Sequence, residues 1–531
     1  MGETVNKAFK ISLFTLLAGT LSLAVGCRHG TSKSGVSGSN LAAADAGDFS
    51  FGDQSQFFFG LATAPAHVED QLNDTWLDFA RSGRVAAWAN QREPERRLDF
   101  WSNPDEEINL AAETGVTVFR LGVDWGRLVP QAGAPIDAAA LKHYHEIVDK
   151  VRAKKMRVMM TLFHHSLPKW ALDLGGWKKP EVRDAFISFG KSMADSFADD
   201  VDYWVIFNEP AVFALLSNVV GIWPGGKPST MAILPLPGAL KGAYFKVIDN
   251  MTASHRALYD YIHAQAGAGR RSPVVGIAQN VGHQLAASRL DIPSVSFARQ
   301  AVNYNFLDAV INQLDFIGLN YYGAELVKGK GTVVDTAYEY SESGRVIDPQ
   351  GMYQTFKQIH ERYNVKFVDR KGKTQLPLIV TENGISDGSD ILRPAYLIEH
   401  LRVVRALLDE GIPIKGYVFW TISDNWEWAD GYCPKFGLVA VDRTKNLKRN
   451  KRPSYGLFKA IVEQGGVSAK QMSEAWQLVT EHVGKPRPFC RNADGITSEQ
   501  DPYDRLIVGR DWRFNKDRPM SNAETGPFEA W

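Results

Sequence analysis

Cysteine is scarce in this chain of 531 residues, which contains only Cys27, Cys433 and Cys490. So few cysteines exclude the disulfide framework that small secreted domains depend on. No Cys/His cluster has the spacing of a zinc site. Two free thiols are therefore expected at Cys433 and Cys490, with a single bridge between them as the alternative.

An excess of one charge is also absent, because 60 Lys and Arg are balanced by 60 Asp and Glu. A neutral balance does not draw a protein to nucleic acid as a polyanion, so we expect no nucleic-acid partner. The hydrophobic content of 44% is ample for a large core. The 14 Trp, 17 Tyr and 28 Phe suit a site for sugars or apolar ligands, and equally an aromatic core.

The N-terminal apolar segment is too short for a comfortable bilayer span. Lys7 and Lys10 precede apolar residues 11–25, an arrangement typical of an export signal. The segment ends in LAVGC, which resembles a bacterial lipoprotein box in which Cys27 would be acylated. Ordinary cleavage and an uncleaved anchor are the alternatives. We expect an exported protein, anchored by lipid to a membrane in the periplasm, at the outer membrane or at the cell surface.

The sequence predicts four parts. Residues 1–27 form the signal, and residues 28–50 form a Gly/Ser-rich flexible tether. Residues 51–465 form one catalytic domain, and residues 466–531 form a C-terminal extension that packs on it.

Eight short apolar runs alternate with helical patterns along the predicted catalytic domain. Near-continuous apolar runs are typical of parallel strands covered on both faces. Eight strand–helix units predict an α/β fold, the (β/α)8 TIM barrel. A doubly wound sheet would need a Gly-rich phosphate turn after the first run, and GLATAPAHVED lacks one. The runs are 57–64, 116–125, 157–164, 203–209, 273–280, 314–322, 377–384 and 416–424.

Polar residues follow these runs where each strand would end, and this face of a barrel carries the active site. Glu209 and Glu382 end the fourth and seventh runs, so their carboxyl groups would face each other across the barrel mouth. Two opposed carboxyl groups, one protonated and one ionised, are what glycoside cleavage requires. The structural alternative makes Glu209 a helix cap and pairs Glu382 with a surface lysine.

Six segments, in order along the chain, resemble glycoside hydrolase family 1. They are FRLGVDWGRLVP, LFHHSLPKWA, FNEP, FIGLNYYG, VTENG and FWTISDNWEWADGYCPKFGLVAVDR. The resemblance implies a retaining β-glycosidase or transglycosidase that cleaves β-D-galactosides or β-D-glucosides through a covalent glycosyl-enzyme. Its substrate would be a small-molecule β-glycoside or a glycolipid. Such chemistry requires no cofactor.

The resemblance also assigns roles, with Glu209 as the general acid/base and Glu382 as the nucleophile. Asn208 would bind the sugar 2-hydroxyl, and Arg120 and Tyr322 would lie near Glu382 and favour its ionised form. The remaining substrate-binding residues would be His67, His164, Asn320, Trp420, Glu427 and Trp428.

Two departures from the usual family pattern indicate a particular branch. His67 stands at or near the place of a glutamine that usually binds the glycone, and His165 stands where tryptophan usually follows His164. Both resemble a plant branch whose enzyme transfers galactose between galactolipids and releases diacylglycerol. Galactolipid galactosyltransfer is therefore the alternative function. A divalent cation is a candidate cofactor only under this alternative. A catalytically silent carbohydrate-binding lipoprotein is a minor alternative.

Overall fold

The computed structural model describes residues 47–518, apart from 86, 226–227, 234–240, 266–271, 330, 336, 367–374 and 491–504. Cys27, the predicted signal and nearly all of the predicted tether therefore lie outside the described residues. Within the described part, no helix has the combination of length and apolarity that a bilayer span needs.

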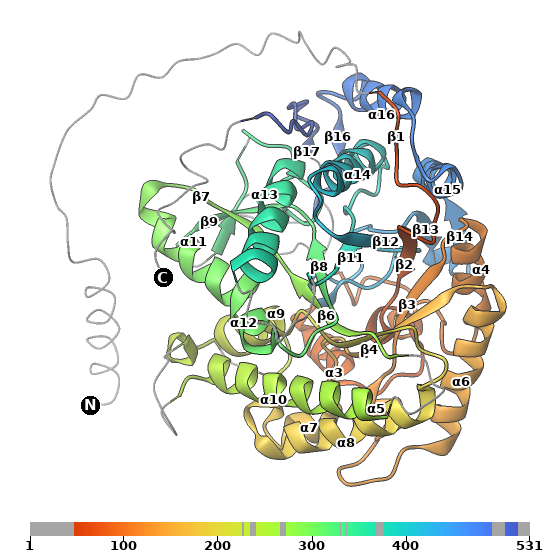
Figure 1. Ribbon diagram of the computed structural model, residues 1–531, viewed down its shortest axis with the longest axis vertical. Coiled ribbons are helices and arrows are strands. Elements are labelled where there is room, and N and C mark those ends of the chain that lie inside the picture. The colour runs from red at the N-terminus through yellow and green to blue at the C-terminus, as the bar shows by residue number, and fades with distance from the viewer. Residues whose placement is uncertain are drawn as a thin grey trace, which may run out of the picture. The chain divides into compact units, whose positions relative to one another are not determined.

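Eight parallel strands close into a barrel in the order β11-β12-β2-β3-β4-β5-β6-β8. Each strand falls within one of the eight predicted runs, apart from two residues at the start of β12, so the predicted fold class is confirmed. Figure 1 shows the barrel strands surrounded by the longer helices. The strands are β2 Phe58–Ala62, β3 Val118–Gly122, β4 Arg157–Phe163, β5 Tyr203–Asn208, β6 Val275–Asn280, β8 Phe316–Tyr321, β11 Leu378–Asn383 and β12 Ile414–Phe419.

Helices cover the outside of the barrel because their apolar faces need a partner and the strands are apolar on both sides. Most of these helices begin at a residue that suits a helix N-terminus. Pro180, for example, opens α8, where its missing N–H costs no hydrogen bond. The longer helices are α4 Asp105–Glu113, α6 Ala138–Ala153, α8 Pro180–Phe197, α10 Ala243–Ala264, α13 Pro349–His360, α14 Arg393–Asp409 and α15 Pro453–Gln464.

The barrel interior is filled with side chains from every strand, so it is a packed core rather than a pore. Trp420 and Phe436 belong to this core, and Tyr322 of the site packs against it. Glycines bring neighbouring strands close together. At Gly318 of β8 an added Cβ would lie 2.3 Å from the carbonyl oxygen of Ile277 in β6. The interior cluster is Phe58, Ala62, Ala64, Val118, Met159, Val205, Ala278, Phe316, Ile379, Val418, Trp420 and Phe436.

Several elements lie outside the predicted strand–helix repeat. A three-stranded sheet has the order β10-β9-β7, and β13 pairs with β14 as an antiparallel hairpin. Short helices occupy the connections after several strands. These elements are β7 His283–Ala286, β9 Ala324–Lys328, β10 Gly331–Val333, β13 Val439–Asp442, β14 Lys448–Lys451, α2 Pro65–Val68, α3 Thr75–Phe79, α5 Trp125–Leu128, α7 Lys169–Asp173, α9 Pro210–Leu215, α11 Ile292–Arg299 and α12 Asn305–Val310.

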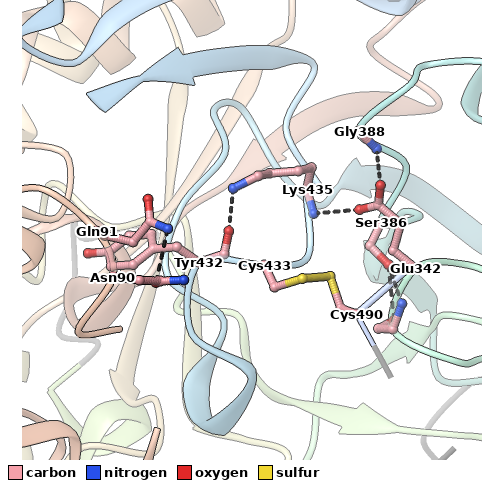
Figure 2. The surroundings of a disulfide bond; sticks show 10 residues. Asn90, Gln91, Glu342, Ser386, Gly388, Tyr432, Cys433, Lys435 and Cys490 are labelled. Atoms are coloured by element: carbon pink, nitrogen blue, oxygen red, sulfur yellow. Dashed lines mark hydrogen bonds between the residues drawn. A yellow bond between two sulfur atoms is a disulfide. The ribbon is translucent and has the colours of Figure 1, made fainter. Parts of the chain in front are cut away.

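The described part of the C-terminal segment contacts the barrel domain at several places. Helix α16, Ala469–Glu481, packs beside α14, and Trp476 Nε1 donates to Glu399 Oε1 at 2.8 Å. Further along, Cys490 forms a disulfide with Cys433 (Figure 2). The expectation of two free thiols was therefore wrong, because folding brings residues 57 positions apart into bonding range.

Candidate functional site

Glu209 lies at the junction of β5 and α9, in a conformation that turns the chain sharply. Its φ of 43° and ψ of 54° are left-handed, and Pro210 opens the helix immediately afterwards. A glutamate in this conformation is uncommon and marks a constrained site. The side chain makes no capping hydrogen bond. Instead, Oε1 accepts hydrogen bonds from Asn280 at 3.0 Å and Asn320 at 2.9 Å. Glu209 therefore occupies the N-cap position of α9, but its carboxyl group does not cap the helix.

Glu382 lies near the end of β11 and is held by a cation and a phenol. Arg120 Nη1 donates to Oε1 at 2.5 Å, and Tyr322 Oη donates to Oε2 at 2.6 Å. Both Arg120 and Glu382 are buried. The partner is therefore a buried arginine from β3, not the surface lysine of the structural alternative. Charge-assisted bonds of this kind favour the carboxylate form.

Arg120 also connects the two glutamates through a chain of amides. Its Nη2 donates to Asn208 Oδ1 at 2.7 Å, and Asn320 Nδ2 donates both to Asn208 Oδ1 at 3.1 Å and to Glu209. Thr381 Oγ1 donates to Asn320 Oδ1 at 2.7 Å and orients that amide. Four strands of the barrel thus contribute to one network.

The two carboxyl groups are electrostatically coupled. The pKa of Glu382 is raised to about 7, because burial and, to a smaller extent, the charge of Glu209 outweigh the opposing effect of Arg120 and Tyr322. Burial also acts to raise the pKa of Glu209, but the protonated form of His165, together with Asn320 and Asn280, lowers it below the usual value. The pair therefore retains one proton in mildly acid to neutral solution. In this arrangement Glu382 holds the proton, whereas the assigned roles need the proton on Glu209 and an ionised Glu382. The proton must therefore move from Glu382 to Glu209 before Glu209 can act as the acid.

Aromatic rings form one wall of the site. His67 lies edge-on to Trp420, at 5.0 Å between ring centroids, and to Trp428, at 4.1 Å. Trp420 Nε1 donates to Glu427 Oε1 at 3.1 Å, which ties the apolar platform to a carboxyl group. Burial raises the pKa of Glu427 well above its usual value. A platform beside hydrogen-bonding groups suits a sugar, which has an apolar face and hydroxyl edges.

Three neutral imidazoles converge near Asn208. Burial lowers the pKa of His67 to about 3, and it also lowers the pKa values of His164 and His165. His67 Nδ1 contacts the Trp426 carbonyl oxygen. His164 Nε2 and His165 Nε2 are both hydrogen-bonded to Asn208 Nδ2. Each ring has a second nitrogen for which the described residues provide no hydrogen-bond partner. Each of the three rings therefore keeps one nitrogen whose hydrogen-bonding capacity the described residues do not use.

The structure brings all the predicted site residues of the barrel into one connected set of contacts, whereas Cys27 lies outside the described residues. Asn280 and Arg345 are among the members that were missed. Asn280 ends the fifth predicted run, so its position as a polar residue at a strand end could have identified it. Arg345 could not be identified in this way, because it lies in a loop after β10 and reaches the site only in three dimensions, with its guanidinium 5.4 Å from the Tyr322 ring centroid. The described residues include no group of three or more His, Cys, Asp or Glu side chains that could hold a metal ion.

Comparison with known proteins agrees with this geometry. The family model described as glycosyl hydrolase family 1 matches residues 54–305 and 300–467. The chain is 42% identical to the chloroplastic galactolipid galactosyltransferase SFR2 of Arabidopsis thaliana, over 87% of this chain and 82% of that protein. It is 28% identical to β-glucosidase A of Thermotoga maritima, over 77% of this chain and 97% of that protein.

Solved structures show the same architecture. The β-glycosidase from Pyrococcus horikoshii superposes with a TM-score of 0.68 and 25% identity, covering 81% of this chain and 98% of that chain. The Thermotoga maritima β-glucosidase in complex with deoxynojirimycin gives a TM-score of 0.67 and 25% identity, covering 80% of this chain and 100% of that chain.

Proposed function

Because the chain belongs to glycosyl hydrolase family 1 and is an enzyme that acts on glycosyl bonds, we propose that it transfers a β-galactosyl group from one galactolipid to another. The observation that carries the substrate class is the 42% identity with a galactolipid galactosyltransferase over most of both chains. Hydrolysis of soluble β-glucosides or β-galactosides is the second candidate. It is favoured by the match to nearly the full length of a β-glucosidase.

The proposed reaction has two steps. In the first, the Glu382 carboxylate attacks the anomeric carbon while the carboxylic acid of Glu209 protonates the glycosidic oxygen, and diacylglycerol leaves. In the second, a hydroxyl group of the acceptor galactolipid attacks the covalent glycosyl-enzyme, and Glu209 takes the proton of that hydroxyl group. Water in place of the acceptor gives hydrolysis and free galactose. Retention of the anomeric configuration follows from the two inversions.

The groups around the two glutamates support these roles. Arg120 and Tyr322 stabilise Glu382 as a carboxylate, which is the form that attacks. Asn208 is the proposed ligand of the sugar 2-hydroxyl, and the wall of His67, Trp420 and Trp428 is the proposed seat of the glycone. No resident cofactor is part of the proposal. Chelation of divalent cations with EDTA tests whether transfer between lipids depends on them.

The decisive experiment is incubation of the protein with monogalactosyldiacylglycerol, followed by product analysis. Oligogalactolipids with diacylglycerol would support transfer, and free galactose with monogalactosyldiacylglycerol consumption would support hydrolysis. No turnover of the lipid, with cleavage of aryl β-glycosides, would favour a soluble substrate. A protein inert toward all of these would support the silent carbohydrate-binding alternative. Glu382→Ala is the control that should abolish every product.

The roles of the two glutamates are tested by labelling. A 2-fluoro-2-deoxy-glycosyl fluoride should attach to Glu382, as identified by mass spectrometry of the digested protein. Attachment to Glu209 would reverse the assignment.

We also propose the lipid anchor at Cys27 and export, on the basis of the N-terminal sequence. Metabolic labelling with palmitate in a bacterial host should mark the wild type and not a Cys27→Ala variant. Labelling of both would contradict acylation at this residue.

A further inference from the structure

The hydrogen bonds around Asn208 define the orientation of its amide. A guanidinium group can only donate, so the Asn208 atom 2.7 Å from Arg120 Nη2 must be the oxygen. The nitrogen then faces the two imidazoles, at 2.9 Å from His164 Nε2 and 3.2 Å from His165 Nε2. The amide nitrogen donates both of its hydrogens, one to each ring.

This orientation determines the tautomers of both histidines. Because each Nε2 accepts a hydrogen bond, each ring carries its hydrogen on Nδ1 and is neutral. Both hydrogens of Asn208 are therefore used by the protein in this structure. A sugar hydroxyl that accepts a hydrogen bond from Asn208 must replace one of the imidazoles. The bond to His165 is the longer of the two and is the one expected to give way.

His165 is held firmly beside Glu209. Its backbone has a φ of 64°, and its carbonyl oxygen accepts a hydrogen bond from Trp76 Nε1 at 2.9 Å. The ring packs on Phe213 and Trp223, at 6.1 Å and 4.7 Å between centroids. His165 Nε2 lies 3.9 Å from Glu209 Oε2, which is too far for a hydrogen bond but close enough for a small rotation to form one.

We propose that His165 is a positioning residue that couples glycone binding to the protonated form of Glu209. When a sugar hydroxyl takes the Asn208 hydrogen, the lone pair of His165 Nε2 is released and accepts a hydrogen bond from the carboxylic acid of Glu209. The coupling holds Glu209 as the acid only when a sugar is in place. This inference rests on the proposed function, since it requires Glu209 to act as the acid. The tryptophan that usually follows His164 in the family pattern has no such acceptor.

The test uses leaving groups that differ in their need for an acid. Departure of phenol from a phenyl β-galactoside requires protonation, whereas 2,4-dinitrophenol leaves without it. In a His165→Phe variant, kcat/KM should fall at least about 10-fold more for the phenyl substrate than for the dinitrophenyl substrate. A His165→Gln variant keeps an acceptor oxygen and should recover most of the loss. If the role of His165 were merely structural, its replacement would lower kcat/KM for both substrates by the same factor.

The 2-deoxy form of each substrate tests the coupling itself, because it lacks the hydroxyl that would engage Asn208. With 2-deoxy substrates, wild type and His165→Phe should show the same ratio between the two leaving groups. The proposal is overturned if His165→Phe lowers kcat/KM equally for the two ordinary substrates. It is also overturned if the larger loss of kcat/KM for the phenyl leaving group persists with the 2-deoxy substrates. If His165→Phe does not fold, as judged by circular dichroism, the same comparisons are made with His165→Gln and His165→Leu. A wild type that cleaves no glycoside would contradict the proposed function as well, whereas unchanged leaving-group dependence in an active variant contradicts this inference alone.

Discussion

Arg120 is the residue on which both carboxyl groups depend, although it contacts only Glu382 directly. Its three donor nitrogens bind Glu382, Thr381, Asn208 and Thr161. A buried cation is costly unless its donors are satisfied, and here the site itself satisfies them. The same bonds that stabilise Arg120 also orient Asn208 toward the histidines and hold the carboxyl group of Glu382 in place. Arg120 therefore determines both the charge and the geometry of the site.

The proton shared by Glu209 and Glu382 predicts how activity depends on pH. The pair loses its last proton as the pH rises through the Glu382 value of about 7. It gains a second proton only below the usual glutamate value of 4.5, because the pKa of Glu209 is lowered. Since the reaction needs one proton on the pair, kcat/KM should fall on both sides of this window, with the alkaline limb near pH 7. A profile of kcat/KM against pH measures this, and an alkaline limb above about pH 9 would contradict it.

Replacement of Tyr322 by phenylalanine tests the second donor to Glu382. The lost hydrogen bond to a charged group should lower kcat/KM by about 10- to 100-fold. Because Tyr322 lowers the pKa of Glu382, the alkaline limb should also move to higher pH. Tyr363→Phe is the matched control, since Tyr363 Oη likewise donates to a carboxylate, that of Asp308, at 2.8 Å, but away from the site. The interpretation fails if the two variants have equal activity.

At the scale of elements, the junction between β5 and α9 shows how a strand delivers a catalytic group. The strand is apolar because both of its faces are covered, and it ends at Asn208. The backbone turn at Glu209 then directs its carboxyl group into the barrel mouth, while the N–H of Glu209 donates to the Ala278 carbonyl oxygen in the neighbouring strand at 2.7 Å. Asn280, which ends that neighbouring strand, binds the same carboxyl group. Adjacent strand ends thus build the site jointly.

Close approach of barrel strands depends on glycine, and Gly318→Ala should be destabilising. The added Cβ would lie 2.3 Å from the Ile277 carbonyl oxygen and 2.7 Å from Thr381 Cγ2. Overpacking of this kind typically costs about 1–3 kcal/mol of the free energy of unfolding, and a clash with backbone places Gly318 at the upper end. Gly456 in α15 is the matched control, because an added Cβ there meets nothing within 4 Å. Gly456→Ala should instead stabilise the helix by about 0.5–1 kcal/mol.

Urea denaturation of both glycine variants checks these values. Since Thr381 also orients Asn320, the Gly318→Ala variant should lose activity along with stability, whereas Gly456→Ala should keep its activity. Equal stability of the two variants would show that the strands can separate without cost.

At the scale of the whole molecule, the disulfide joins the C-terminal segment to the loop that follows the last barrel strand. Cys433 lies in that loop, shortly after Trp428, and the Cys490 backbone N–H donates to the Glu342 carbonyl oxygen at 2.9 Å. Glu342 in turn accepts hydrogen bonds from the backbone of Gly388 and Lys435 (Figure 2). One cross-link therefore ties together three loops near the barrel mouth.

Removal of the cross-link should lower stability. In the chain-entropy model, a loop closed over 57 positions accounts for about 4 kcal/mol of the free energy of unfolding. A Cys433→Ala/Cys490→Ala double variant should lose about 2–4 kcal/mol, and reduction with dithiothreitol should lower the unfolding temperature of the wild type but not of the variant. A wild type whose unfolding temperature does not respond to reduction would contradict a stabilising bridge.

The amino-acid sequence by itself determined the eight barrel strands and the pairing of Glu209 with Glu382. Strand identity follows from uninterrupted apolar runs, and the position of the glutamates follows from where those runs end, both of which are local properties of the chain. The disulfide, Arg345 near Tyr322 and the small sheet of β7, β9 and β10 were decided only by tertiary structure, because each joins segments whose separation in sequence carries no periodic signal. The same holds for the Asn208 orientation. An amide can turn either way until Arg120, brought in from another strand, requires an oxygen to face it.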